Sequence, residues 1–189
     1  MIQISGLKYV PNYLSKENCE FLLKAIYDNE WMSELSRRVQ HYGYKYDYRS
    51  RAIDMTMKGR PFPNWAILLT QRLKKDGYIK DLADQLIVNE YLSGQGIANH
   101  IDCEPCFGDT IASISLGSSC IMNFVEKNSK NKVELLLEPC SLLVLSGQAR
   151  YKWTHGINKR LYDQYKSEKL KRTTRVSLTF RKVILSTPI

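Results

Sequence analysis

Three polar residues in the second half of the chain have the types and spacing of metal ligands. His100 and Asp102 are two positions apart, so in an extended segment both side chains point to one side and Ile101 points to the other. His155 lies in a second strand-like segment, YKWTHGI. Two imidazoles and one carboxylate around one ion form the facial triad of non-haem Fe(II) oxygenases, which leaves coordination positions open. The alternative is that each histidine is an ordinary hydrogen-bonded polar residue.

A second chemical pattern lies near the end of the chain, in TRVSLTFRKVIL. Period-two alternation predicts a strand with a polar face of Arg175, Ser177, Thr179 and Arg181 and an apolar face of Val176, Leu178 and Phe180. If the apolar face packs against helices, both arginines face the interior, where each needs an anionic partner to offset its lost hydration. A dicarboxylate supplies that charge, and a guanidinium matches a carboxylate bidentately. An edge strand with solvated arginines is the alternative.

Asn89 and Tyr91 share one side of another predicted strand, in VNEYL. A side-chain amide and a phenol can both hydrogen-bond the same dicarboxylate. Polar residues on an ordinary strand face are the equally simple interpretation. The glycines of SGQG, which follow, are typical of a turn leading into the segment that carries His100.

The elements that must position these residues are mainly short strands. Eight segments with turn residues between them suggest a sandwich or jelly roll: QLIVNEYL, GIANHID, TIASISLG, CIMNFV, VELLLE, SLLVLSG, YKWTHGI and TRVSLTFRKVIL. Upstream, Ser15 can cap a helix to about Asn29, whose core face would be Phe21, Leu22, Ala25 and Ile26. Residues 38–48 alternate like a strand, residues 50–63 read as an unpacked loop, and a second helix starts at Asn64 and ends at Gly77.

Composition indicates the setting of this fold. The 189 residues carry a formal net charge of +9, which favours a polyanionic partner such as nucleic acid. The length suits one domain, residues 1–189, and a monomer. Five cysteines at irregular positions do not suggest a disulfide framework and fit a reducing cytoplasm. The sequence shows neither an export signal nor a membrane span, so we expect a cytoplasmic protein without a membrane partner.

Taken together, these motifs resemble one family. The runs NEYLSGQGIANHIDCEPCFGDTIASISLGSSCIMNF, SLLVLSGQARYKWTHGI and RVSLTFR are similar to the AlkB family of Fe(II)- and 2-oxoglutarate-dependent dioxygenases. The resemblance is strong from about residue 86 to residue 183 and weaker before it. It implies an α+β, mainly β fold: a double-stranded β-helix (jelly roll) at 86–189, preceded at 1–85 by helices and a substrate lid.

The resemblance also implies the roles of the site residues. His100, Asp102 and His155 match the iron ligands. The 2-oxoglutarate contacts match Asn89, Tyr91, Arg175 and Arg181, with Arg175 the partner of the distal carboxylate and Arg181 nearer the metal-chelating end. Fe(II) is the implied cofactor, and 2-oxoglutarate and O2 are the implied cosubstrates.

The implied activity is oxidative demethylation of N-alkylated bases in DNA or RNA, with release of formaldehyde, succinate and CO2. The details GQGI, HID, SLGS and ARYKWTHGI look closer to the domain that hydroxylates a modified wobble uridine in tRNA, which is the alternative. That type usually carries further domains for RNA binding and methyl transfer. Two further classes remain. The positive charge disfavours a hydroxylase of protein or small molecules, and the retained motifs disfavour a non-catalytic jelly-roll binding module.

Three residues are the implied substrate contacts. YGYKYDY, at 42–48, resembles a strand of the family's nucleotide lid, in which Tyr44 would reach the cosubstrate or the target base and Tyr46 would support the lid or the substrate backbone. A base removed from its stack needs aromatic faces to replace the lost stacking. Glu104 falls where the family's demethylases place an acid for a base amino group, although a solvated loop residue is the alternative. For Tyr42 and Tyr48, core packing is at least as good an interpretation.

Two segments remain open at this level. The basic run at 159–172 reads either as a solvated loop or as a phosphate-contacting surface with Lys45, Arg49 and Arg51. Cys103 and Cys106 form a lone C-x-x-C without further ligands for zinc, so they read as ordinary loop cysteines.

Overall fold

The computed structural model describes residues 3–33, 36–47, 53, 56–129 and 131–185. The helices are α1 (Lys16–Tyr27), α2 (Asn64–Lys75) and α3 (Gly147–Tyr151). The strands are β1 (Leu7–Val10), β2 (Val39–Gly43), β3 (Gln85–Tyr91), β4 (Ile97–His100), β5 (Phe107–Gly117), β6 (Cys120–Glu126), β7 (Lys132–Leu137), β8 (Leu142–Ser146), β9 (Trp153–Ile157), β10 (Tyr162–Tyr165), β11 (Glu168–Lys171) and β12 (Arg175–Val183).

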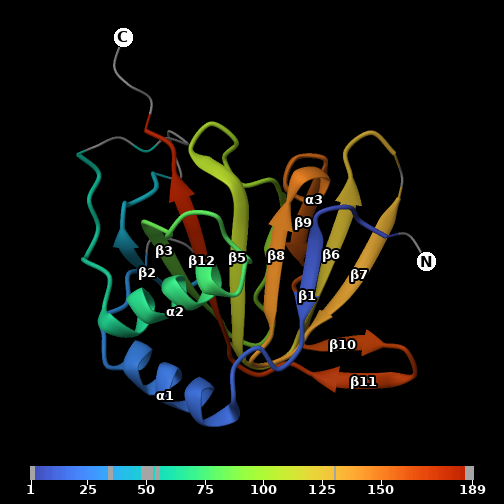
Figure 1. Cartoon of the computed structure of the whole chain (residues 1–189). Helices are drawn as coiled ribbons and strands as arrows, with labels where there is room; N and C mark the ends of the chain where they lie inside the picture. Colours follow the sequence, from blue (N-terminus) through green and yellow to red (C-terminus); the bar gives the residue numbers. More distant parts are fainter. Residues whose placement is uncertain (1–2, 34–35, 48–52, 54–55, 130, 186–189) are drawn as a thin grey trace.

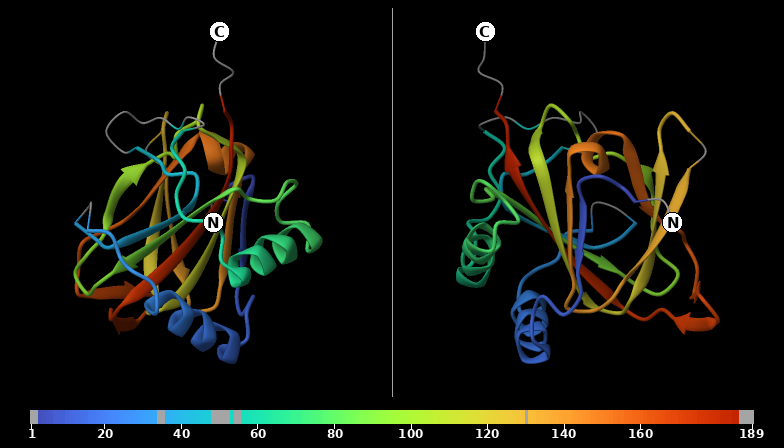
Figure 2. Two further views of the ribbon diagram at one scale, coloured as in Figure 1. Left: turned by 90° about the vertical axis from the view of Figure 1, so that its left-hand side faces the viewer. Right: turned by 45° about the vertical axis from the view of Figure 1, so that its right-hand side comes forward.

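Two antiparallel sheets form the body of the protein. The larger has the strand order β1-β8-β5-β12-β3-β2 and the smaller has the order β4-β9-β6-β7. Helices α1 and α2 lie together on one face of the larger sheet, and the smaller sheet lies on its other side (Figures 1 and 2). The predicted mainly β jelly roll with helices from the first half of the chain is therefore confirmed.

Strand β12 divides the interior because it lies at the centre of the larger sheet, between β3 and β5. Its apolar side chains Val176, Leu178 and Phe180 belong to the core that also contains buried residues of both long helices. A second buried cluster lies between the sheets and includes Phe107 and Phe124. The predicted alternation along β12 is confirmed, since its polar face is turned toward the space between the sheets.

The two long helices begin and end close to their predicted bounds. Ser15 caps α1 by accepting a hydrogen bond from the backbone N–H of Asn18 at 3.3 Å. Leu22 and Ile26 are buried as predicted, but Phe21 is 62% exposed, which corrects its assignment to the core. The buried stripe of α1 starts from Cys19 rather than Phe21, because positions 19, 22 and 26 recur at helical spacing on one face.

The tyrosine run at 42–48 is not one strand. Strand β2 ends at Gly43, whose φ is +77°, and a Cβ there would overlap the carbonyl oxygen of Asp84. The chain turns at this glycine, and Tyr44 then forms an isolated bridge with Lys58. Tyr42 is buried in the core, as one interpretation held, whereas Tyr48 lies outside the described residues.

Part of the loop expected at 50–63 is packed. Ile53 is buried in the cluster between the sheets, and Arg60 forms a backbone bridge with Tyr42. Arg49 and Arg51 lie outside the described residues, so their predicted phosphate contacts stay predictions. The expectation of an unpacked loop is wrong for these described positions, because an apolar side chain and backbone hydrogen bonds hold them against the sheet.

The basic run at 159–172 forms the hairpin of β10 and β11 rather than a loop. Its base is fixed by Asp163, a buried carboxylate that accepts hydrogen bonds from Arg172 Nε at 2.6 Å and from Arg160 Nε at 2.7 Å. The hairpin projects from the end of the jelly roll at which β12 begins (Figure 1). The sequence did not predict these strands because the many charged residues leave no alternation of apolar and polar positions.

The cysteines also depart from expectation. Disulfide bonds join Cys19 to Cys140 and Cys103 to Cys106, while Cys120 is buried and free. Cys19 and Cys140 are 121 residues apart in sequence, so only the docking of α1 beside the turn before β8 brings them together. Among the residues described, no helix is long and apolar enough to cross a membrane.

Candidate metal and cosubstrate site

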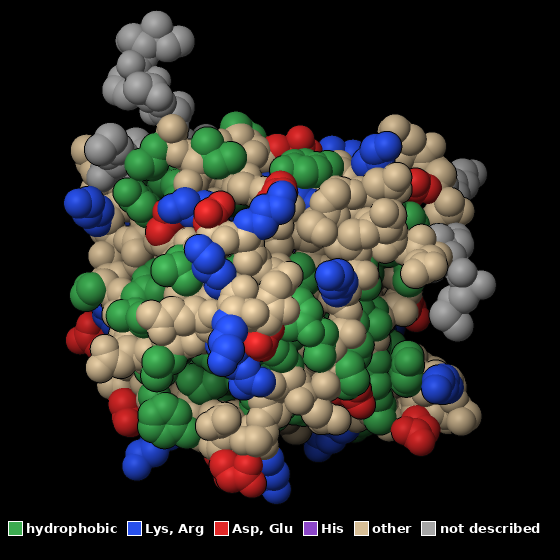
Figure 3. All heavy atoms as spheres, in the orientation of Figure 1, with side chains coloured by type: hydrophobic (Ala, Val, Ile, Leu, Met, Phe, Trp, Pro, Cys, Tyr) green, Lys and Arg blue, Asp and Glu red, His purple; other side chains and the backbone are tan. Residues whose placement is uncertain are grey.

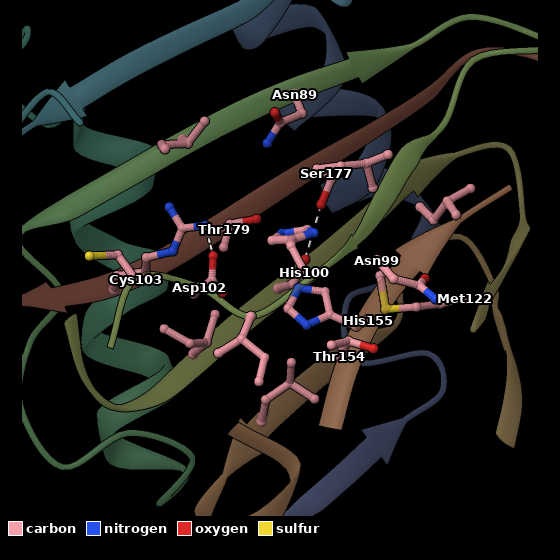
Figure 4. Close-up of a pocket in the computed structure, with 18 of the residues that line it drawn as sticks. Asn89, Asn99, His100, Asp102, Cys103, Met122, Thr154, His155, Ser177 and Thr179 are labelled. Carbon is pink, nitrogen blue, oxygen red and sulfur yellow. Dashed lines mark hydrogen bonds and ion pairs between the residues drawn. The ribbon is translucent and has the colours of Figure 1, made fainter. Parts of the chain in front are cut away.

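A cavity of about 830 Å³ lies between the two sheets. Its walls include every residue that the sequence singled out as a metal or cosubstrate ligand: Asn89, Tyr91, His100, Asp102, His155, Arg175 and Arg181. Several of these side chains point into one space from both sheets (Figure 4). Residues separated by more than 90 positions in sequence therefore converge on one site.

The pairing of β4 with β9 brings the two histidines together. His100 and His155 lie directly opposite each other in this pair, and their ring centroids are 4.5 Å apart. One ligand atom each from His100, Asp102 and His155 lies within 4.8 Å of the others. Two imidazoles and one carboxylate in this arrangement fit a facial triad for Fe(II).

Each histidine has a ring nitrogen available to a metal ion. His100 Nδ1 lies 2.8 Å from the carbonyl oxygen of Ala98, so an Nδ1–H donates there and Nε2 is left for an ion. Burial is the main cause that lowers the pKa of His155, to about 4, against the opposing attraction of Asp102. His155 is therefore neutral at neutral pH, as a metal ligand must be.

Two arginines hold Asp102, one through its carboxylate and the other through its backbone carbonyl. Burial alone would raise the pKa of Asp102, but the nearby cations, above all Arg181, hold it at about 2. Arg181 Nη2 donates to Asp102 Oδ1 at 2.7 Å, and Arg150 Nη1 donates to the Asp102 backbone carbonyl at 2.9 Å. Arg150 is buried and also binds the carbonyl of Cys103. No sequence pattern had marked Arg150, because it stands alone in a short helix.

The arginines on β12 make the cavity suitable for an organic anion. Arg175 is 3% exposed, and Nη2 donates to Ser115 Oγ at 2.8 Å. The Nε atoms of Arg175 and Arg181 are buried and have no hydrogen-bond partner among the described residues. Buried guanidinium donors without partners are costly unless an acceptor fills them. A dicarboxylate such as 2-oxoglutarate fits this donor set.

Asn89 and Tyr91 lie beside Arg175 on the neighbouring strand β3, in which Tyr91 is directly opposite Arg175. The Arg175 guanidinium lies 5.6 Å from the Tyr91 ring centroid. Asn89 Oδ1 accepts a hydrogen bond of 2.8 Å from Arg37 Nε, a residue that also lines the cavity. Sequence reasoning missed Arg37, since it stands in the short segment between α1 and β2 and belongs to no motif.

The three predicted substrate residues are placed differently from one another. Tyr46 is 9% exposed, lines the cavity and packs against Phe107 with ring centroids 5.5 Å apart. Tyr44 is half-buried, and it is not among the described residues that line the cavity. Glu104 is at the cavity wall and forms an ion pair of 3.2 Å with Lys127. Of the two lid tyrosines, Tyr46 is therefore the better placed for a ligand.

Comparison with known proteins agrees with this geometry. The sequence profile described as "2OG-Fe(II) oxygenase superfamily" matches residues 11–181. The chain belongs to this superfamily. Within this family, it is 35% identical to the "Alkylated DNA repair protein ALKBH8 homolog" of Arabidopsis thaliana over 96% of the chain and 59% of that protein. It is 37% identical to the "tRNA (carboxymethyluridine(34)-5-O)-methyltransferase ALKBH8" of Mus musculus over 94% of the chain and 30% of that protein.

These relatives place the chain among the AlkB-type dioxygenases, as the motifs implied. The structure titled "The structure of OsALKBH1" has the same fold, with a TM-score of 0.68 and 17% identity over 96% of this chain and 98% of that chain. As a 2OG-Fe(II) oxygenase, the protein uses Fe(II), 2-oxoglutarate and O2. The chain spans 59% of the length of the plant relative and 30% of the length of the mouse relative. The complete activities of those proteins therefore cannot be assigned to this chain from the shared fold.

Proposed function

We propose that this AlkB-type dioxygenase oxidises a C–H bond on a base of nucleic acid. The observation that carries the proposal is the shared cavity, in which the His100, Asp102 and His155 cluster and the aromatic side chain of Tyr46 line one space of about 830 Å³. That volume suits a small dicarboxylate together with one nucleotide. Tyr46 supplies an aromatic face for a base taken out of its stack.

The chain's own residues bind and orient the reactants. His100, Asp102 and His155 would hold Fe(II), and Arg175 would bind the distal carboxylate of 2-oxoglutarate, with Asn89 and Tyr91 beside it. When bound, Fe(II) with 2-oxoglutarate and O2 supplies oxygen transfer: one oxygen atom enters the product, and the other enters succinate as CO2 is released. Arg181 fixes the Asp102 carboxylate through its 2.7 Å hydrogen bond. The Nε of Arg181 is buried without a partner among the described residues, so it remains for the metal-chelating end of 2-oxoglutarate.

A modified uridine in tRNA is the favoured substrate. Glu104, which a demethylase of the family would use toward a base amino group, forms an ion pair with Lys127 here. The mouse relative's name states an action on a uridine at position 34 of tRNA. That name describes methyl transfer by a protein of which this chain spans 30%, so hydroxylation rather than methylation is proposed for the dioxygenase fold.

Demethylation of N-alkylated bases, the activity first expected from the sequence, is the second candidate. The name of the plant relative supports it, since it refers to the repair of alkylated DNA. Oxidation of an N-methyl group gives an unstable hydroxymethyl product that releases formaldehyde, whereas oxidation of a stable carbon leaves the hydroxyl in place. The two candidates therefore differ in the substrate and not in the oxidation step.

Mass spectrometry of products separates the candidates. Purified protein with Fe(II) and 2-oxoglutarate is incubated with total tRNA and with methylated DNA and RNA oligonucleotides, and the nucleosides are then analysed. A nucleoside that gains one oxygen atom supports the tRNA candidate, and loss of a methyl group with formaldehyde supports the demethylase. His100→Ala is the inactive control, and Lys16→Ala, on the exposed face of α1, is the matched surface control. Turnover of 2-oxoglutarate with no change in any nucleic acid would refute the proposal.

A further inference from the structure

Arg37 reaches the cosubstrate end of the cavity from outside the jelly roll. It stands between α1 and β2, is half-buried and lines the cavity. Its Nε donates to Asn89 Oδ1 at 2.8 Å, and its guanidinium carbon lies 5.4 Å from the Tyr91 ring centroid. It therefore contacts both β3 residues that the cosubstrate site uses.

The contact with Arg37 determines which way the Asn89 amide faces. An asparagine side chain has one acceptor oxygen and one donor NH2 group. Because Arg37 occupies the oxygen, the NH2 group is the part left to face a ligand. In Figure 4 the Asn89 nitrogen points toward the space that holds the triad. A donor in this position requires an acceptor, which a carboxylate supplies.

Arg37 also adds a cation that no carboxylate of the described residues balances. Arg37 and Arg175 lie 5.4 and 5.6 Å from the centroid of the same Tyr91 ring. Within the described part of the chain, neither guanidinium forms an ion pair with Asp or Glu. Two like charges beside one aromatic ring repel each other, and an anion between them relieves that repulsion. The arrangement is stabilised once a dianion enters the cavity.

Neighbouring contacts hold Arg37 in this position. The carbonyl of Ser36 accepts a hydrogen bond from Gln95 Nε2 at 2.8 Å. Arg38 donates two hydrogen bonds, of 2.7 and 2.8 Å, to the buried carboxylate of Glu90. The residues on both sides of Arg37 are thus fastened to β3 and to the turn that follows it. Arg37 is oriented before any ligand binds, which lowers the entropy cost of using it.

We propose that Arg37 is a positioning residue for 2-oxoglutarate. It holds the Asn89 amide with its NH2 group toward the ligand and places a second positive charge beside the carboxylate that Arg175 binds. The inference rests on the cosubstrate site proposed above. It predicts that Arg37 acts on cosubstrate affinity and not on the oxidation step or on the nucleic acid.

The test compares Arg37→Met and Arg37→Lys with Arg60→Met. The side chain of Arg60 is a fair control because it pairs with the exposed Glu30. Calorimetry with Mn(II) in place of Fe(II) measures 2-oxoglutarate binding without turnover. Loss of a charge-assisted hydrogen bond predicts about tenfold weaker binding for Arg37→Met. Arg37→Lys should fall between, and Arg60→Met should match the unaltered protein. In uncoupled turnover, KM for 2-oxoglutarate should rise while kcat at saturation stays unchanged.

A double-variant cycle shows whether Arg37 acts through Asn89. In the Asn89→Ala background, Arg37→Met should weaken 2-oxoglutarate binding less than it does alone. Unchanged affinity in Arg37→Met, or a loss confined to KM for nucleic acid, would overturn the inference while Asn89→Ala still weakened binding. If Asn89→Ala and Arg175→Met both left affinity unchanged, the cosubstrate site itself would be refuted. Thermal melting without ligand identifies a folding defect, and Arg37→Lys then decides the question.

Discussion

Replacing Arg175 by methionine should have opposite effects on the empty and the loaded protein. Arg175 is 3% exposed, its Nε has no partner among the described residues, and Nη2 binds only a neutral hydroxyl, Ser115 Oγ. Methionine has a comparable length and no charge, so it can fill much of the same space. In the empty protein, the exchange removes a buried cation that no carboxylate of the described chain pairs with.

The magnitudes follow from these contacts. Replacing an uncompensated buried charge by an apolar side chain is neutral or stabilising, here by about 1 kcal/mol after loss of the Ser115 hydrogen bond. In the loaded protein, two charge-assisted hydrogen bonds to a carboxylate would be lost, at about 1.5 to 3 kcal/mol each. The two together amount to about 3 to 6 kcal/mol, so the affinity for 2-oxoglutarate should fall by at least about 150-fold.

Urea unfolding with and without ligand measures both effects. At 2-oxoglutarate about 100-fold above its dissociation constant, with Mn(II) present, the unaltered protein should gain about 2.7 kcal/mol, whereas Arg175→Met should gain almost nothing. Lys182→Met, further along β12, is the matched control because that lysine is half-exposed and pairs with Asp84 at the surface. If Arg175→Met lost more than about 2 kcal/mol without ligand and still gained stability from 2-oxoglutarate, Arg175 would serve the fold and the assignment would be refuted.

Three further changes test other parts of the structure. Tyr46→Ala should reduce nucleic-acid turnover about tenfold more than uncoupled succinate release. Tyr44→Ala, outside the cavity, should leave the ratio of these two rates unchanged. Equal losses of both rates in Tyr46→Ala would show that Tyr46 has a structural role. Arg172→Met should lower the free energy of unfolding by about 3 kcal/mol in urea, because it leaves the buried Asp163 carboxylate with one more exposed arginine, Arg160, and the backbone N–H of Ile121. Hydrogen bonds from its arginine partner lower the pKa of Glu90. Its stabilisation should therefore be present above about pH 4.5 and be lost as pH falls through the lower folded pKa, so Glu90→Gln should flatten the acid limb of the stability curve.

The parts of the site that follow a periodic pattern were predictable from the sequence. The period-two alternation of β12 fixed the face on which Arg175 and Arg181 lie, since successive strand residues point to opposite sides. The spacing of His100 and Asp102 likewise required a common direction. His155 lies opposite His100 because two distant segments pair as strands. Local sequence pattern does not report such pairing, so the assignment of His155 as a ligand came from the resemblance to a family.

The unpredicted parts depend on single side chains placed by tertiary packing. Arg37 and Arg150 belong to no periodic set, and their partners lie 52 and 48 residues away in sequence. Phe21 was assigned to the core because it recurs at helical spacing with Leu22, Ala25 and Ile26, but the buried face of α1 is set by Cys19, Leu22 and Ile26. The β10–β11 hairpin is held at its base by the buried carboxylate of Asp163, which cannot be distinguished in the sequence from the other charged residues of that segment. For the three polar groups, Arg37, Arg150 and Asp163, the deciding contacts are electrostatic, and hydrophobic periodicity does not report them.

The net charge of +9 suggested a nucleic-acid partner, but the charged residues inside the cavity do not need one. Within the cavity wall, Arg181 pairs with Asp102 and Lys127 pairs with Glu104, whereas Arg37 and Arg175 form no ion pair among the described residues and are available to the proposed cosubstrate. On the face that carries α1 and α2, basic side chains are interspersed with acidic ones (Figure 3). The cavity's own cations are therefore matched without nucleic acid, and any phosphate contacts must come from exposed lysines and arginines elsewhere.

Salt should therefore separate the two ligands. Exposed phosphate contacts release counterions, so KM for nucleic acid should rise steeply, by at least about tenfold between roughly 50 and 200 mM salt if a few contacts form. The arginines proposed to bind 2-oxoglutarate are buried or half-buried, where screening is weaker, so KM for 2-oxoglutarate should change much less. Both constants can be measured from succinate release in one buffer series. Equal salt dependence would mean that both ligands meet the same solvent-exposed charges, contrary to the buried position of Arg175.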